Sequence, residues 1–211
     1  MIMKLHTLLS IKLIFYISIS LALVSCASAP SVNPLYSNAW NETNAGKIEG
    51  DILIEWVEPD KFKFIPTHGK NPFTFIRMDG DKEIDRITPN KEFYTDGGSI
   101  PQVIKIDKDY SSWRFAPAYI IHDWLFEIHQ CDLDYGKELN HKIAAQIMAE
   151  AIKTQLINEG LTDCDTNLIV EYQKCALFYN IYKSVENFSE EFWNDKLSTC
   201  DLVNHKNIIR R

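Results

Sequence analysis

Two short stretches of this chain combine residue types that could do chemistry. The first, APAYIIHDWLF (116–126), sets His122 beside Asp123 in an otherwise apolar run. The second, FYTDGGSIP (93–101), continues a strand-like run with Asp96, two glycines and a serine. A histidine can move a proton or bind a metal ion, and a carboxylate can orient that histidine or bind a hard cation. We therefore take His122, Asp123 and Asp96 as candidate catalytic and metal-binding residues.

The helical setting of the first stretch constrains what its polar pair can do. Consecutive helical residues point about 100° apart, so His122 and Asp123 cannot hydrogen-bond face to face. An unpaired carboxylate among Ile, Trp, Leu and Phe is costly to bury, so Asp123 needs a partner: the amides of 97–99, a cation such as Arg114, or a metal ion. A tight, backbone-exposed turn suits an anionic side chain or an oxyanion. In this chain that turn consists of Gly97, Gly98, Ser99 and Pro101.

Two interpretations of these residues remain open. In the structural one, Asp96 and Ser99 cap the His-Asp helix while His122 donates to a strand carbonyl, and the buried polar network fixes the sheet to the helix. In the hydrolytic one, His122 activates water, and Asp123 and Asp96 hold a divalent metal such as calcium. The amides of the glycine turn would then stabilise developing charge. Ser99 is not expected to be a nucleophile, because the turn lacks a strand-serine-helix elbow.

Together, the two stretches resemble the domain of unknown function family 1353, which occurs in bacterial and phage proteins. The family pattern runs Asp-Gly-x-Ser-x-Pro, then Ala, then His-Asp-x-x-Tyr, and the resemblance covers roughly residues 85–160. The chain departs from the pattern at Phe126, where relatives usually have Tyr, and at Ala145, where they tend to have Asp. The resemblance implies a family and a phage or prophage connection, without naming an activity. The matching residues are Asp96, Gly97, Ser99, Pro101, His122, Asp123 and Trp124.

The His-Asp-x-x-aromatic pattern is also similar to that of secreted phospholipases A2. In those enzymes the histidine is a general base for water and the aspartate binds calcium. The similarity implies a metal-dependent hydrolase acting on a lipid or cell-wall ester. Phe126 and Ala145 remove two groups that would orient His122 in such a site.

Residues 1–25 have the features of a bacterial lipoprotein signal peptide. Basic residues precede an apolar run, LIFYISISLALVS, that is shorter than the roughly 20 residues of a membrane-spanning helix. The Leu-Val-Ser that ends this run and the following Cys26 resemble a lipobox, in which the cysteine becomes the lipidated first residue of the mature chain. Residue 27 is Ala rather than Asp, which by resemblance to lipoprotein sorting favours the outer membrane. The alternatives are a signal peptide cleaved at Ala27 or Ala29, or an uncleaved anchor.

A lipid-anchored, periplasm-facing protein has the membrane as its first partner, through several acyl chains on Cys26. Removing residues 1–25 takes away two lysines, so the net charge of −7 becomes −9. So acidic a domain, with no lysine-arginine cluster beyond the terminal Arg210–Arg211, is not expected to bind nucleic acid. We expect a non-catalytic envelope binding module, prophage-related, with an envelope component or a phage-related protein as its second partner.

Four cysteines follow Cys26, and an even count predicts two disulfides in an oxidising periplasm. If the last two helices form a hairpin turning near residues 187–188, Cys175 and Cys200 lie at equal distances from the turn. The preferred pair is therefore Cys175–Cys200, which leaves Cys131–Cys164 as the second.

The rest of the chain predicts one α+β domain on a tether. Residues 26–46 are rich in Ser, Asn, Ala and Pro, which predicts a lipidated flexible tether. Residues 47–211 predict a single domain, with short alternating runs between 52 and 95 that form a small antiparallel β-meander. About four helices follow, at 117–129, at 136–158, from an N-cap at Asp165, and from Ser189.

Overall fold

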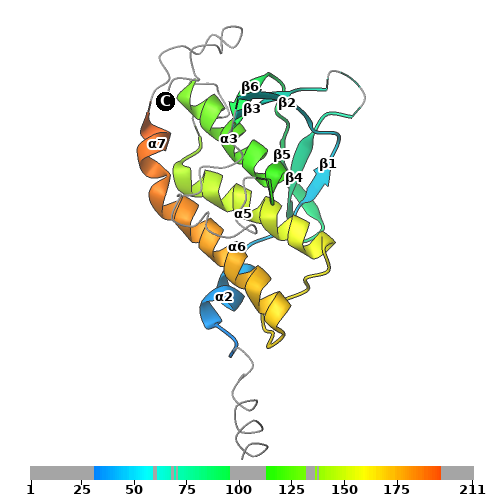
Figure 1. The fold of residues 1–211 in the computed structure, drawn as a ribbon, viewed down its shortest axis with the longest axis vertical. Helices are drawn as coiled ribbons and strands as arrows, with labels where there is room; N and C mark the ends of the chain where they lie inside the picture. Colours follow the sequence, from blue (N-terminus) through cyan, green and yellow to red (C-terminus); the bar gives the residue numbers. More distant parts are fainter. Residues whose placement is uncertain are drawn as a thin grey trace, which may run out of the picture.

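The computed structural model describes residues 31–58, 61–67, 69, 71–95, 113–131, 136 and 138–195. Strands come early in this part of the chain and helices late, apart from one helix that precedes the strands (Figure 1). The elements are α2 (Pro34–Glu42), β1 (Lys47–Glu49), β2 (Leu53–Glu58), β3 (Lys61–Ile65), β4 (Thr74–Asp79), β5 (Lys82–Ile87), β6 (Phe93–Thr95), α3 (Ala116–Gln130), α5 (His141–Asn158), α6 (Ile169–Phe188) and α7 (Glu190–Asn194).

The strands form two three-stranded antiparallel sheets, in the orders β1-β4-β5 and β2-β3-β6. β4 and β5 pair as an antiparallel hairpin, and Gly80, at φ 57°, lies in the turn between them. The expected α+β class is confirmed, but the strands do not form one meander. β1 pairs with β4 and β6 pairs with β3, so the chain moves from one sheet to the other and back.

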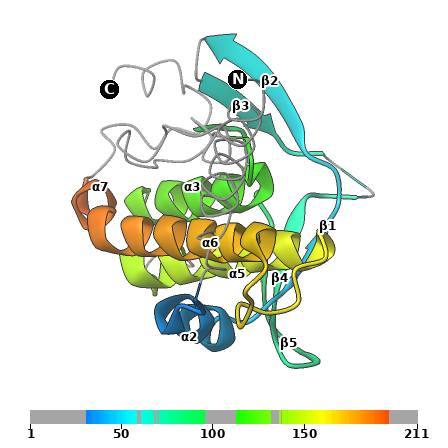
Figure 2. The same cartoon turned by 60° about the horizontal axis from the view of Figure 1, so that its bottom comes forward.

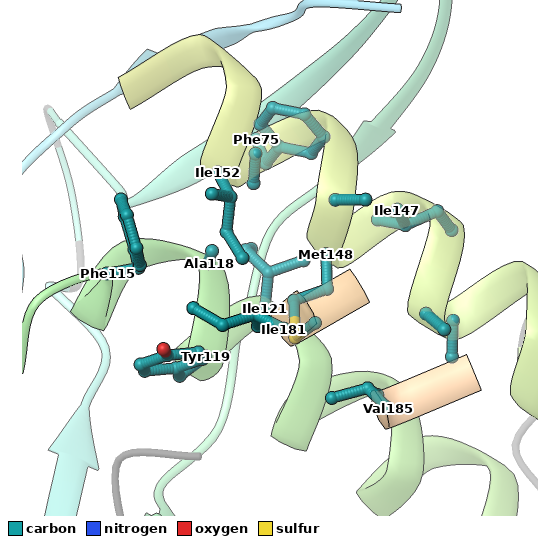
Figure 3. Close-up of a cluster of buried hydrophobic side chains, with 14 of the residues drawn as sticks. Phe75, Phe115, Ala118, Tyr119, Ile121, Ile147, Met148, Ile152, Ile181 and Val185 are labelled. Atoms are coloured by element: carbon teal, nitrogen blue, oxygen red, sulfur yellow. The ribbon is translucent and has the colours of Figure 1, made fainter. Parts of the chain in front are cut away.

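The helices form a layer beside the sheets, with α5 at its centre (Figure 2). α5 packs against both α3 and α6. Four alanines of α5 are buried without any exposed surface, and small side chains allow neighbouring helices to approach closely. One core therefore runs from β4 through α3 and α5 to α6 (Figure 3). Its members include Phe75, Phe115, Ala118, Tyr119, Ile121, Ile147, Met148, Ile152, Ile181 and Val185.

Helix α3 holds the candidate residues, and it is buried on most of its surface. Pro117 occupies its first turn, as expected, because that position needs no backbone N–H. The N-cap is Phe115, whose side chain makes no capping hydrogen bond. Asp96 and Ser99, the expected caps, lie outside the described residues.

The structure corrects the expected flexible tether over 26–46. Residues 34–42 are the helix α2, which Asn33 caps by accepting a hydrogen bond from the backbone N–H of Leu35 (3.0 Å). Trp40 is only 2% exposed and packs edge-on against Phe178 of α6 at 5.4 Å between ring centroids. The ammonium of Lys153 donates to the Trp40 carbonyl at 2.6 Å and lies 4.7 Å from the indole centroid. A buried tryptophan and an N-cap therefore outweigh the polar composition of this segment.

The structure also corrects the disulfide pairing, because Cys164 is bonded to Cys175. Both expected pairs, Cys175–Cys200 and Cys131–Cys164, are therefore wrong. The hairpin argument fails because α7 has only five residues and ends at Asn194. Cys164 lies in the loop before α6, which brings its Cα to 5.7 Å from that of Cys175. Cys131 is disulfide-bonded as well.

Two helix starts differ from expectation for local reasons. α6 begins at Ile169 rather than just after Asp165, because the Asp165 carboxylate accepts a hydrogen bond from Ser37 of α2 (2.6 Å) instead of capping a helix. α5 begins at His141, five residues later than expected, where the Asn140 side chain accepts from the backbone N–H of Ile143 (3.0 Å). The expected starts near residues 117 and 189 agree with α3 and α7.

Candidate functional site

The last residue of β6 anchors the aspartate of α3. The hydroxyl of Thr95 donates to Oδ2 of Asp123 at 2.6 Å, and the Asp123 side chain is 16% exposed. Thr95 immediately precedes Asp96 in the chain, so this bond ties α3 to the start of the Asp-Gly-Gly-Ser motif. The hydroxyl is a partner that the sequence argument did not consider. Arg114, one of the expected partners, makes two 2.6 Å hydrogen bonds to the Glu159 carboxylate.

The imidazole of His122 is enclosed in the protein. Its side chain is 4% exposed, and its ring lies 4.7 Å from the ring of Phe126, centroid to centroid. Nδ1 lies 3.7 Å from Oδ1 of Asp123, which is close enough for electrostatic attraction and too far for a hydrogen bond. This agrees with the expectation that the neighbouring pair cannot bond face to face.

The other ring nitrogen of His122 is the unusual atom of the site. Within the described part of the chain, Nε2 is buried and has no hydrogen-bond partner. A buried polar atom without a partner costs roughly 1–3 kcal/mol, so such atoms are rare and call for an explanation. The hydroxyl of Tyr119, one turn earlier on α3, is buried in the same way. Burial raises the pKa of the Tyr119 phenol above its ordinary value, so this hydroxyl stays protonated.

Phe126 stands where relatives of the proposed family usually carry a tyrosine, and its surroundings are aromatic. Its ring meets that of Trp193 edge-on at 4.8 Å. Trp193, from α7, also stacks on the ring of His129 at 4.0 Å. Nδ1 of His129 is hydrogen-bonded to the Gly136 carbonyl at 3.1 Å. His122 therefore borders an aromatic cluster that joins α3 to α7.

Glu127 is a further ionisable group of α3 that the sequence argument passed over. It follows Asp123 by four residues and is buried, and this burial raises the pKa of its carboxyl to about 7. Its Oε1 lies 3.9 Å from the sulfur of Cys131. The available signal was the i,i+4 spacing of two acids on an apolar helix, which places them on one face. A carboxyl that titrates near neutral pH can exchange protons under physiological conditions.

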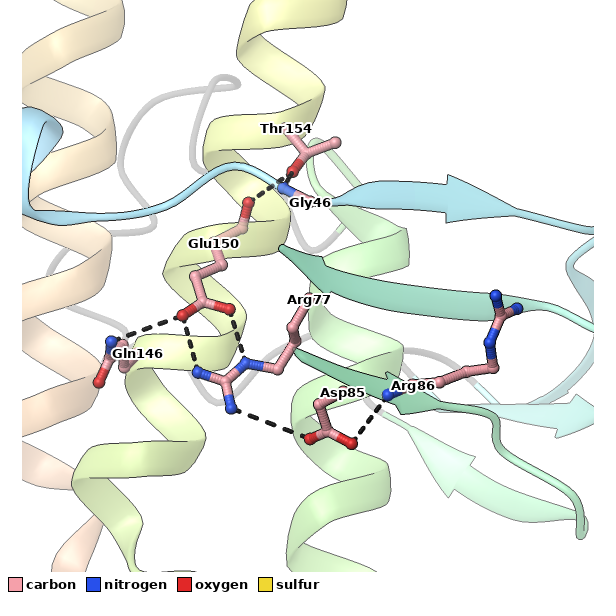
Figure 4. A network of polar contacts seen from close by, with 7 residues as sticks. All are labelled: Gly46, Arg77, Asp85, Arg86, Gln146, Glu150 and Thr154. Carbon is pink, nitrogen blue, oxygen red and sulfur yellow. Dashed lines mark hydrogen bonds and ion pairs between the residues drawn. The ribbon is translucent and has the colours of Figure 1, made fainter. Parts of the chain in front are cut away.

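A second polar junction, also missed, joins β4 to α5 (Figure 4). Arg77 donates from Nε and Nη2 to the two carboxylate oxygens of Glu150, at 2.8 and 2.9 Å. The Glu150 side chain is 2% exposed, and Arg77 also lies 3.9 Å from Asp85. The backbone carbonyl of Glu150 accepts from Thr154, whose hydroxyl accepts in turn from the amide of Gly46. A side chain at position 46 would collide with the Ile76 carbonyl of β4, so a glycine is needed there.

The remaining candidate residues are distributed as follows. Asp96, Gly97, Gly98, Ser99 and Pro101 lie outside the described residues, so their position relative to His122 stays a prediction. Ala145 is fully buried in α5, where relatives would carry a carboxylate. Among the described residues no group of three or more His, Cys, Asp or Glu side chains is placed to hold a metal ion. In the same part of the chain no helix is long and apolar enough to cross a membrane.

The fold and the buried pair define an α+β domain in which a His-Asp helix is bonded to the end of a strand. Residues 73–160 match the family model described as protein of unknown function (DUF1353). The resemblance inferred from the two motifs is thereby confirmed, over a match that begins at β4 and ends after α5. No curated protein and no solved structure matches the chain.

Proposed function

We propose that this is a lipid-anchored envelope protein whose DUF1353 domain is a non-catalytic binding module of prophage origin. Cys26 would carry the acyl chains, and the domain would face the periplasm from the outer membrane. The lipobox-like sequence before Cys26 supports the anchor. The disulfide between Cys164 and Cys175 fits an oxidising compartment, where such bonds form and persist. Its partner would be an envelope component or a phage-related protein.

The hydrogen bond from Thr95 to Asp123 carries the non-catalytic assignment. It gives the carboxylate a fixed partner inside the fold and holds α3 to the end of β6. His122 packs against Phe126 at 4% side-chain exposure, so its ring is shielded from bulk water. A general base must reach the proton it abstracts directly or through one water, and this enclosure favours a structural role.

Purified protein of residues 27–211 tests this assignment together with the variants His122→Ala and Asp96→Asn. We expect no stoichiometric metal by elemental analysis, no turnover on a panel of esters, and lower melting temperatures for both variants. Metal or turnover in the parent protein that disappears in folded variants would contradict the assignment.

A metal-dependent hydrolase is the second candidate, and one observation favours it. Nε2 of His122 is buried without a partner among the described residues, and a water or substrate group next to the Asp96 motif would satisfy it. His122 would then activate water, and Asp96 and Asp123 would hold a divalent cation such as calcium. For this candidate, adding Ca²⁺ raises the melting temperature of the parent protein and leaves that of Asp96→Asn unchanged. Equal responses of both proteins would dismiss it.

The lipid anchor has a separate test. The parent protein, expressed in a bacterium with two membranes, is expected to incorporate labelled palmitate, and Cys26→Ser is expected to lose the label. Cys200→Ser is the matched control because it removes a cysteine far from the signal peptide. Labelling that persists in Cys26→Ser contradicts the anchor.

A further inference from the structure

The start of α6 exposes three successive apolar side chains. Leu168, Ile169 and Val170 are 59%, 60% and 65% exposed. They line an open hollow of about 620 Å³ between the end of α5 and the first turn of α6. Single exposed apolar residues are ordinary, but a contiguous group of large ones marks an interaction surface.

Further exposed apolar residues lie at the beginning of the described chain, and α2 brings them to the same end of the molecule. Val32 and Leu35 are both exposed. The hydroxyl of Ser37 donates to the Cys164 carbonyl at 3.1 Å, and α2 packs beside α6 (Figures 1 and 2). The ring of Tyr36 lies 5.5 Å from that of Tyr172, in the first turn of α6. We call this surface, made of Val32, Leu35, Leu168, Ile169 and Val170, the apolar end.

The chain length before α2 restricts where a lipid anchor can lie. Asn33, the cap of α2, is the seventh residue after Cys26, and seven residue steps span at most about 25 Å. An anchor on Cys26 therefore stays within about 25 Å of the start of α2. The 20 residues of α6 place its other end roughly 30 Å from its start. Because residues 34–42 of the expected tether form the packed helix α2, the anchor holds the start of α6 toward the membrane.

We propose that the apolar end lies against the lipid surface, with Leu168, Ile169 and Val170 among the headgroups and upper acyl chains. This inference rests on the lipid anchor of the proposed function. We assign the lipid surface as the partner of the apolar end because the short segment between Cys26 and Asn33 keeps the anchor beside this end.

The charges around the apolar end indicate which lipid it contacts. Lys174 is one cation there, and it is paired with Glu159, 3.5 Å away. Asp163 and Glu171 add negative charge, and the Glu171 carboxylate accepts from Thr166 at 2.7 Å. The described residues place no basic cluster at the apolar end, so they give it no attraction to anionic lipid. Apolar contact with zwitterionic headgroups is therefore the expected mode.

Tryptophan substitution in the full-length lipidated protein tests the proposal. Val170→Trp places a reporter at the apolar end, and Phe188→Trp places a matched reporter at an exposed position 18 residues along α6, about 27 Å away. Both proteins are reconstituted in phosphatidylcholine vesicles with or without lipid brominated high on the acyl chain. The emission that each variant adds to that of the parent protein is then compared.

We expect the added emission of Val170→Trp to fall about twofold or more in brominated vesicles, since an interfacial ring reaches the acyl boundary. The emission added by Phe188→Trp should stay unchanged. Equal quenching at both positions, or quenching at residue 188 alone, would overturn the proposal. A blue-shifted but unquenched Val170→Trp would also overturn it, because a protein rather than lipid would then cover the end.

Palmitate labelling of the same preparations separates this inference from its premise. A labelled protein whose Val170→Trp emission is not quenched retains the anchor and refutes the orientation. An unlabelled protein refutes the anchor and the orientation with it. Both variants should keep the melting temperature of the parent protein, because positions 170 and 188 are exposed.

Discussion

Two polar junctions tie sheets to helices in this domain, and they differ in how completely their atoms are paired. At the β4–α5 junction, Arg77 and Glu150 share two parallel hydrogen bonds, and the Gln146 amide donates to Oε1 of Glu150 at 3.5 Å. At the β6–α3 junction, Thr95 bonds one oxygen of Asp123, while Nε2 of His122 has no partner among the described residues. Both junctions lie inside the segment that matches the DUF1353 family.

Among the described residues, the difference separates a junction that holds the fold together from one in which a buried nitrogen has no partner. Both oxygens of the buried Glu150 carboxylate accept from Arg77, so the β4–α5 junction is structural. The β6–α3 junction retains a buried nitrogen that a water, a ligand or the adjoining Asp-Gly-Gly-Ser segment can satisfy. A buried polar atom that lacks a hydrogen bond lowers stability, and in natural proteins such atoms are found at functional sites.

Breaking the paired junction should have the largest effect. Arg77→Met leaves the Glu150 carboxylate buried without its cation, and we expect the free energy of unfolding to fall by about 3–5 kcal/mol in urea titrations. Arg86→Met is the matched control because Arg86 is exposed on the neighbouring strand β5. It should change the unfolding free energy by less than about 0.5 kcal/mol. Similar losses for both variants would show that the buried pair is not the main contributor.

The pH dependence of stability should report Glu127, four residues from Asp123. Its folded pKa of about 7 lies above the ordinary value of 4.5, so the folded state binds more protons than the unfolded state between these values. Protonated Glu127 therefore stabilises the folded state: this contribution to the free energy of unfolding is fully present below pH 4.5 and is lost as the pH rises through about 7. A pKa shift of this size corresponds to a change in the free energy of unfolding on the order of 3 kcal/mol. Urea titrations from pH 4 to 8 should show a decline that Glu127→Gln abolishes, and an equal decline in that variant would contradict the assignment.

Removing the Thr95 hydroxyl should have an intermediate effect. Thr95→Val deletes a hydrogen bond to a charged acceptor and should cost about 2 kcal/mol in the free energy of unfolding. Thr88→Val deletes a neutral hydrogen bond to Thr74 of 2.9 Å, and its cost should be about 1 kcal/mol. If Thr95→Val costs no more than Thr88→Val, Asp123 is not held mainly by this hydroxyl.

Replacing His122, whose Nε2 has no partner in the part of the chain that the structure describes, should have the smallest effect. His122→Leu keeps a side chain of similar size and removes this buried nitrogen, so the free energy of unfolding should stay within about 1 kcal/mol of the parent value or rise. His129→Leu is the matched control: it loses the bond to the Gly136 carbonyl and the stack on Trp193, and should destabilise by about 1–2 kcal/mol. A larger loss for His122→Leu than for His129→Leu would mean that Nε2 is satisfied in solution.

Local patterns identified most strands and two helix starts. The alternating runs between 52 and 95 predicted β2 and the strands of the β4–β5 hairpin, because side-chain alternation is set within a few residues. Pro117 marked the start of α3 because the first turn of a helix needs no backbone N–H at that position. The pairing of β1 with β4 and of β6 with β3 was not predictable in this way, since strand partners depend on which apolar faces meet in the core.

The failures of prediction have one physical source, which is contact between distant segments. Composition described 26–46 as a tether, but Trp40 gains a buried site only when Phe178 and Lys153 are brought beside it. The disulfide was misassigned because equal distances along an assumed hairpin do not fix where the loop before α6 folds. Arg77 and Glu150 lie 73 residues apart, and each alone resembles an ordinary surface charge.

By itself the sequence determined the α+β class, the resemblance of residues 73–160 to the DUF1353 family and the helix that carries His122 and Asp123. Each depends on residue types at short, fixed spacings, which the backbone converts into local structure. Tertiary structure alone decided that Thr95 bonds Asp123, that Nε2 of His122 is left without a partner among the described residues, and that Arg77 pairs with Glu150. Burial sets the energy of a polar atom, and burial is a property of the packed chain rather than of any segment.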